Sequence, residues 1–107
     1  MTEEQLKVLR RIIERSLNNT QLLILKELVN NAHYTNVTDF IENLSEKYNI
    51  PESTIRWNVG ILRDIGFIRC GNLRERGIPV RIEESGKIIL DVLSSDFIFD
   101  EKKEEVI

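Results

Sequence analysis

Cysteine and histidine are scarce in this chain of 107 residues, which holds one of each, Cys70 and His33. A single cysteine cannot form an internal disulfide. One cysteine and one histidine cannot supply the three or four ligands of a usual zinc site. The sequence therefore predicts no metal site and no cofactor, and we expect both residues to be structural.

Long apolar runs and catalytic motifs are also missing. No stretch approaches the roughly 18 apolar residues of a membrane-spanning helix, and the N-terminal residues lack the pattern of a secretory signal. There is no glycine-rich phosphate loop, no nucleophile elbow and no paired histidine and cysteine. We therefore expect a cytoplasmic protein that does not insert into membranes and is not an enzyme.

Net positive charge is absent too, since the formal charge is −3 and the pI is about 5.2. This excess of acidic residues argues against strong, indiscriminate DNA binding. The charge is unevenly distributed. Residues 47–87 hold eight Lys or Arg against five Asp or Glu, whereas residues 88–107 hold two against six. A basic segment within an acidic chain is typical of a selective nucleic-acid binder.

Residues 52–65, within the basic segment, have the spacing of an amphipathic helix. Ile55, Val59 and Leu62 recur at helical intervals and form one apolar stripe. The opposite face carries Ser53, Arg56, Trp57, Gly60 and Asp64. These residues suit a helix that lies in a DNA groove. A solvated face is the alternative interpretation.

The residues before this helix predict another helix that ends abruptly. Leu44 and Tyr48 are four residues apart and share a face, while Ser45 is small enough for close helix contact. Asn49 stands where a residue with positive φ commonly ends a helix, and Asn tolerates that conformation well. Pro51 suits the first turn of the next helix, because its missing N–H has no partner there. Two helices joined by a sharp turn are expected.

From Leu44 to Ile68 the chain resembles the helix-turn-helix of winged-helix regulators, such as the prokaryotic MarR and ArsR types. The residues that match the usual pattern are Ser53, Thr54, Ile55, Val59, Leu62, Gly66, Phe67 and Ile68. The departures are Ser45 for Ala, Asn49 for Gly, Pro51 for a capping Ser, and Trp57 for a basic residue. The resemblance implies a winged helix-turn-helix fold, mainly α with a small β-hairpin wing.

Two short β-prone runs follow, from Phe67 to Cys70 and from Ile78 to Ile82, with a basic connection between them. In the winged-helix family this hairpin, about residues 69–81 here, is the wing, which lies on the phosphate backbone or enters the minor groove. The arginines that the wing would bring to DNA are Arg69, Arg74, Arg76 and Arg81. The resemblance covers about residues 20–95.

Further helices are expected on either side of the helix-turn-helix. Residues 21–32 should form the first core helix, with an inward face made of Leu22, Leu25, Leu28, Val29 and Ala32. The next helix should begin near Thr38 and bury Phe40, Ile41 and Leu44, with Tyr34 and Tyr48 at the core or its boundary.

The resemblance implies one winged-helix domain over residues 1–96, with its core and wing in residues 20–83 and extra N-terminal and C-terminal helices on either side. Thr2 and Gln5 form a capping-box pattern ahead of the first helix, which should end near residue 18. Residues 84–96 should form the last helix. Regulators of the MarR type dimerise through such flanking helices. The resemblance thus implies a homodimer through the helices that run from Leu6 to Leu17 and from Ile88 to Leu93.

An apolar triplet, Phe97 to Phe99, joins this domain to an acidic tail that ends at residue 107. The expected arrangement is that the triplet packs on the body and the tail is solvated. The alternative is that the triplet docks a protein partner or shields the basic face.

These patterns predict a sequence-specific, double-stranded-DNA-binding transcriptional regulator, a nucleoid-associated repressor, with residues 52–65 in the major groove. The expected DNA contacts are Ser53, Thr54, Arg56, Trp57, Gly60, Arg63, Arg69, Arg74, Arg76 and Arg81. Arg56 could reach a base edge or a phosphate, and Trp57 could instead lie in the core or an interface. The alternative function is a winged-helix module for protein contact in a transcription, replication or membrane-remodelling assembly.

Overall fold

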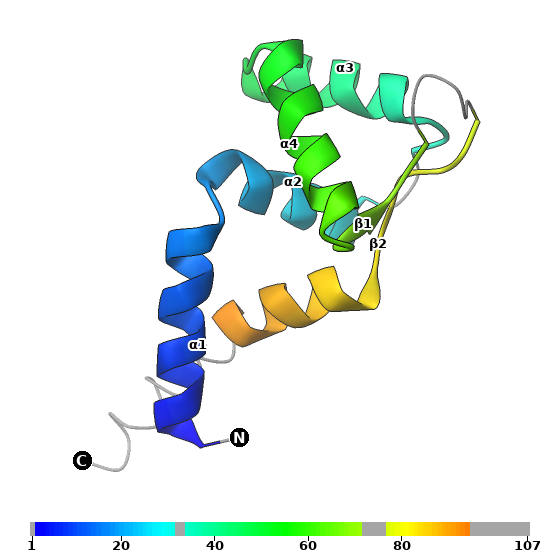
Figure 1. The fold of residues 1–107 in the computed structure, drawn as a ribbon. Helices are drawn as coiled ribbons and strands as arrows, with labels where there is room; N and C mark the ends of the chain where they lie inside the picture. Colours follow the sequence, from blue (N-terminus) through cyan, green and yellow to red (C-terminus); the bar gives the residue numbers. More distant parts are fainter. Residues whose placement is uncertain (1, 32–33, 72–76, 95–107) are drawn as a thin grey trace.

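The computed structural model describes residues 2–31, 34–71 and 77–94. These residues form mainly helices and one small hairpin (Figure 1). The elements are α1 (Glu3–Ser16), α2 (Asn19–Asn30), α3 (Val37–Tyr48), α4 (Glu52–Asp64), β1 (Ile68–Arg69), β2 (Arg81–Ile82) and a C-terminal helix over residues 84–94. The prediction of a mainly α fold with a small β-hairpin is confirmed.

Capping boxes begin the first two helices. At α1, the Thr2 hydroxyl accepts from the Gln5 N–H at 3.1 Å, and the Gln5 side chain accepts from the Thr2 N–H at 2.8 Å. This is the reciprocal pair that the sequence predicts. Asn18 and Gln21 repeat the arrangement at α2. The chain therefore turns sharply between α1 and α2 without leaving these N–H groups unpaired.

The centre of the core lies where α2, α3 and α4 meet. Its fully buried side chains are Ile24, Leu25, Leu28, Phe40, Leu44, Ile55, Leu62 and Val80. The inward face predicted for α2 was partly wrong, because Val29 is 50% exposed and Ile24 is fully buried. The face of α2 that is buried in the structure is turned toward α4 and the hairpin, and it includes Gln21, Ile24 and Leu28. Ala32 lies outside the described residues.

The hairpin pairs β1 with β2 antiparallel, with Ile68 opposite Ile82 and Arg69 opposite Arg81. Its strands are shorter than the sequence predicts. Val80 is one reason, because its N–H donates to the Tyr34 carbonyl at 3.1 Å and joins the connection before α3 in an isolated bridge. Pro79, next to it, has no N–H to add to the ladder. The predicted tip residues Arg74 and Arg76 lie outside the described residues.

The C-terminal helix begins directly against the turn between α4 and β1. The Ser85 hydroxyl donates to the Gly66 carbonyl at 2.6 Å, and the Glu83 N–H donates to the Phe67 carbonyl at 2.9 Å. A Cβ on Gly86 would lie only 2.5 Å from that same Phe67 oxygen and 2.8 Å from Cγ1 of Ile82. Glycine is therefore required at position 86 by close approach of the helix to the hairpin.

From the hairpin, the C-terminal helix runs back toward α1 (Figure 1). Val92 belongs to the same buried cluster as Leu6, Ile13 and Leu17 of the N-terminal segment. The two ends of the described chain thus share the core. No helix in these residues combines the length and apolarity needed to cross a membrane.

Candidate nucleic-acid interface

The turn between α3 and α4 has the conformation that the sequence predicts. Asn49 adopts the left-handed conformation, with φ 54° and ψ 46°. The Ile50 N–H donates to the Ser45 carbonyl at 3.3 Å, as in a Schellman motif. The Ser45 hydroxyl donates back to the Ile50 carbonyl at 2.7 Å. Two hydrogen bonds between the same residues therefore fix the angle at which the chain enters α4.

Pro51 precedes the first helical residue of α4 rather than occupying its first turn. It holds the N-cap position with no side-chain capping bond, and its carbonyl accepts from the N–H groups of Thr54 and Ile55. The prediction that Pro51 lies in the first turn was therefore one position off, whereas the predicted helix start at residue 52 is confirmed. Glu52 begins the helix, where its carboxylate faces the positive end of the helix dipole.

The two faces of α4 are divided as predicted. Ile55, Val59 and Leu62 are buried. The predicted contact residues Ser53, Thr54, Arg56 and Trp57 are exposed in the first turns of the helix. Trp57 is 72% exposed, so the alternative that it belongs to the core of this chain is excluded. A hydroxyl pair, a guanidinium and an indole thus share the outward surface of α4.

Asn58 fixes the rotation of α4 about its own axis, and the sequence interpretation missed it. Its side chain is buried, and its amide N–H donates to the Thr54 carbonyl at 2.8 Å. Its amide oxygen accepts from Asn18 at 3.0 Å and from Gln21 at 3.1 Å, both at the start of α2. The available signal was phase, because position 58 lies on the helical face of Ile55 and Leu62.

Gly60 is partly buried on α4, and a Cβ added there would meet nothing within 4 Å. Packing in the described residues therefore does not require a glycine at this position. Because glycine lowers helix stability by roughly 1 kcal/mol relative to alanine, its presence has no stabilising role within the helix.

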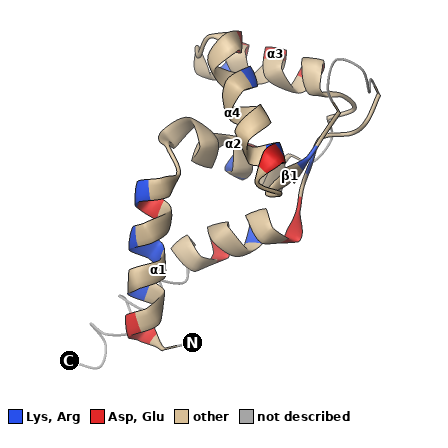
Figure 2. Ribbon diagram, viewed as in Figure 1, with Lys and Arg blue, Asp and Glu red and all other residues tan. Residues whose placement is uncertain are grey.

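The arginines at the end of α4 and on β1 lie beside carboxylates. Arg63 lies 3.5 Å from Asp64, and Arg69 lies 3.3 Å from Glu83. Arg69 and Arg81 are both exposed and stand directly opposite each other on the hairpin. Figure 2 shows this meeting of charges, basic at the hairpin and acidic at the start of the C-terminal helix. Like charges at opposite positions destabilise a strand pair, so an anion bound between them would relieve that repulsion.

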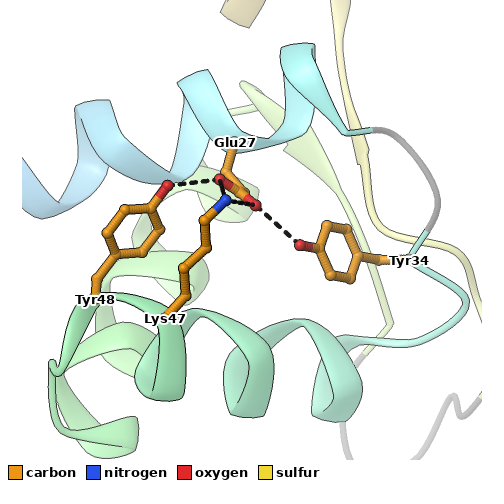
Figure 3. Close-up of polar contacts among 4 residues, drawn as sticks. All are labelled: Glu27, Tyr34, Lys47 and Tyr48. Atoms are coloured by element: carbon orange, nitrogen blue, oxygen red, sulfur yellow. Dashed lines mark hydrogen bonds and ion pairs between the residues drawn. The ribbon is translucent and has the colours of Figure 1, made fainter.

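A second feature that the sequence interpretation missed is the nearly buried carboxylate of Glu27 on α2, which is 4% exposed (Figure 3). Its Oε1 accepts from the Tyr34 hydroxyl at 3.0 Å and its Oε2 from the Tyr48 hydroxyl at 2.8 Å. Lys47 Nζ lies 3.2 Å from both oxygens. These bonds join α2 to the connection before α3 and to the C-terminal end of α3. Both oxygens are engaged, which makes Glu27 a structural anchor between α2 and the segment from Tyr34 to Tyr48.

The hydrogen bonds of Glu27 predict that stability depends on pH at both extremes. Burial would raise the pKa of Glu27, but the bonds from Tyr48, Lys47 and Tyr34 together lower it below its ordinary value of 4.5. The contribution of the Glu27 carboxylate to the free energy of unfolding is therefore complete above its ordinary pKa. This contribution is lost as the pH falls through the lower pKa of the folded state.

At alkaline pH, stability depends on pH with the opposite sign. Burial and the bond to Glu27 raise the pKa of Tyr34 above 10.0, so its contribution is present at neutral pH and is lost as the pH rises through the folded-state pKa. Urea unfolding across the pH range should show both losses. Glu27→Gln should reduce the loss of stability at both the acid and the alkaline end. If both losses were unchanged in that variant, the Glu27 hydrogen bonds would not be their cause.

Cys70 is buried, and burial raises the pKa of its thiol, which fits the structural role expected of it. His33 lies outside the described residues. Among residues 2–31, 34–71 and 77–94, no three His, Cys, Asp or Glu side chains are grouped as a metal site would require.

Comparisons of this chain with protein-family models, with curated proteins and with solved structures found no match.

Proposed function

We propose that this protein is a winged helix-turn-helix regulator that binds double-stranded DNA in a sequence-specific manner. The observation that carries the proposal is the outward surface of α4, where Arg56 and Trp57 are exposed beside the helix start. That helix follows a fixed turn, as a reading helix must. The Tyr34 bridge to Val80 supports the winged-helix interpretation further, because it joins the segment before α3 to the hairpin.

In this proposal α4 lies in the major groove with its N-terminal half against the bases. Ser53 and Thr54 offer hydroxyls to base edges or phosphates, and Arg56 can donate two hydrogen bonds to a guanine. Trp57 offers apolar surface to a thymine methyl group. Gly60, a turn further along, leaves room for the helix backbone to approach DNA. Repression by occlusion of a promoter is the simplest regulatory consequence.

The hairpin has a different part in the same proposal. Arg69 and Arg81 are exposed and lie directly opposite each other on β1 and β2, and together they can bind a backbone phosphate. Such contacts position a protein on the duplex without reading its sequence. Arg63, at the end of α4, is placed to add a third contact. Arg74 and Arg76 keep their proposed role at the tip, which lies outside the described residues.

Duplex binding as a function of salt, measured by titration, tests this division of roles. Wild-type affinity should fall steeply as salt is raised. Arg81→Ala should weaken all sequences alike and reduce the slope of log affinity against log salt by about 1. Arg56→Ala or Trp57→Ala should cost about 1–3 kcal/mol on the preferred sequence and less on others. The preferred sequence comes from selection among random duplexes.

Lys26→Ala is a matched control, because Lys26 is an exposed cation on α2, and helical spacing puts it on the side of the helix opposite to the buried Ile24 and Leu28. It should leave affinity and salt slope unchanged. Equal losses on every sequence for Arg56, Trp57 and Arg81 variants would mean that α4 does not read bases.

The second candidate function is a winged-helix module that contacts a protein. The exposed indole of Trp57 favours it, because tryptophan is enriched at the centres of protein interfaces. The acidic balance of the chain favours it as well. Absence of any salt-sensitive duplex binding would support this second function over the first.

A further inference from the structure

Two opposite charges lie one turn apart on the exposed side of α4 without pairing. Glu52 is the first residue of α4 and Arg56 follows four positions later, and both are exposed. A glutamate four residues before an arginine has the spacing and the order that favour an ion pair on a helix. Arg10 and Glu14 form such a pair on α1, at 3.1 Å. Within the part of the chain that the structure describes, Glu52 and Arg56 do not, so both can bind another molecule.

The polar side chains of α4 suit some bases and not others. An arginine can donate two hydrogen bonds to guanine, and a carboxylate can accept one from the amino group of cytosine. The two bonds to adenine need an Asn or a Gln. Helix α4 has no Gln, and its one Asn, Asn58, is buried and bonded to Asn18 and Gln21. The exposed groups of this helix therefore suit G·C pairs and lack the usual adenine contact.

We propose that Glu52 determines sequence specificity by accepting a hydrogen bond from a cytosine near the guanine that Arg56 binds. This inference rests on the proposed function, because it requires α4 to lie in a major groove. Four residues of a helix rise about 6 Å, and base pairs are about 3.4 Å apart, so the two bases lie within about two base pairs of each other. The ligand is thus a duplex with guanine and cytosine at neighbouring positions.

The charge of Glu52 adds a repulsive part to this specificity. A carboxylate in a DNA groove lies near the phosphates of both strands, so it weakens binding to every sequence. Only cytosine returns a hydrogen bond that offsets the repulsion. Specificity then comes from rejection of other bases as well as from contact with the correct one. Removal of the charge should therefore tighten binding to unselected DNA and relax the preference for cytosine.

Selection of bound duplexes from random DNA, with wild type and with Glu52→Gln, tests the proposal. The wild-type consensus should contain a cytosine within about two base pairs of the guanine that is lost with Arg56→Ala. Glu52→Gln keeps the shape of the side chain and removes its charge, and glutamine suits adenine. In this variant adenine should replace that cytosine and be preferred to it by about fivefold or more. Titration with unselected duplex at fixed salt should show tighter binding than wild type.

Glu84→Gln is the matched control, because Glu84 is also the exposed first residue of a helix, the one over residues 84–94. Each glutamate faces the positive end of its helix dipole, so both variants lose the same kind of stabilisation at a helix start. Glu84→Gln should leave the base preference unchanged. Urea unfolding checks that both variants remain folded.

Two results would overturn this proposal and leave the proposed function in place. One is a wild-type consensus with no cytosine near the guanine that Arg56 binds. The other is a Glu52→Gln consensus identical to that of wild type, which would mean that Glu52 only stabilises the start of α4. A wild-type chain that binds all duplexes alike, or binds none, would overturn both proposals together, because no base would then be read.

Discussion

Gly86→Ala should lower the free energy of unfolding by about 2–3 kcal/mol, although alanine is the better helix former. The added methyl group would lie 2.5 Å from the Phe67 carbonyl oxygen. That oxygen cannot easily move, because it accepts the N–H of Glu83 at 2.9 Å and belongs to the residue before β1. The C-terminal helix must then shift away from the hairpin. Urea unfolding followed by far-ultraviolet circular dichroism measures the loss.

Gly60→Ala is the matched control, because it makes the same change within another helix. Apart from the backbone of its own helix and its chain neighbours, nothing lies within 4 Å of the methyl group added at position 60. The helix preference for alanine then acts alone and should raise the free energy of unfolding by about 0.5–1 kcal/mol. Opposite signs at the two positions are expected. A stabilising Gly86→Ala would mean that the helix does not approach the hairpin as closely as described.

Glu27→Ala should lower the free energy of unfolding by about 3 kcal/mol, the other large effect. Hydrogen bonds to a charged group contribute about 1.5–3 kcal/mol each, and bonds that share an acceptor do not add fully. The substitution removes the acceptor of both Tyr34 and Tyr48 and leaves a space beneath α3. Thermal and urea unfolding at neutral pH measure the change.

Two further variants separate the parts of this cluster. Glu27→Gln keeps the shape and one acceptor oxygen, so it should cost less than Glu27→Ala. Lys47→Met should also cost less, because the lysine side chain is 57% exposed and water screens its charge. If Glu27→Ala were no more harmful than Lys47→Met, the tyrosine bonds would contribute nothing to stability.

Local features of the chain could be predicted well from sequence. The left-handed Asn49, the capping box of Thr2 and the buried stripe of α4 each depend on residues within a turn or two of one another. Their signals are complete in a short window, so no knowledge of the tertiary fold is required. The exposure of Trp57 followed from the same helical phase.

Features set by distant partners were not predictable in this way. Val29 and Ile24 are both apolar residues of α2, and which of them is buried depends on where α4 and the hairpin lie. The burial of Glu27 requires two tyrosines and a lysine from other segments, seven or more positions away. Asn58 likewise needs its partners at the start of α2. Sequence periodicity cannot identify such long-range polar contacts.

The candidate surface was predictable only in part for the same reason. Helical phase placed Ser53, Thr54, Arg56 and Trp57 together on α4. The direct opposition of Arg69 and Arg81 depends on hairpin register, and the pairing of Arg69 with Glu83 depends on where β2 ends. Register is a property of two strands together, which neither short run specifies alone.

The exposure of Trp57 also determines what light can reveal about this protein. Trp57 is the only tryptophan of the chain, and at 72% exposure its indole already lies largely in water. Unfolding moves it from one aqueous environment to another, so its fluorescence changes little when the core is lost. Burial of the indole against any bound molecule would shift the emission to shorter wavelength. Tryptophan fluorescence in this chain is therefore an optical signal of the occupancy of α4 rather than of folding.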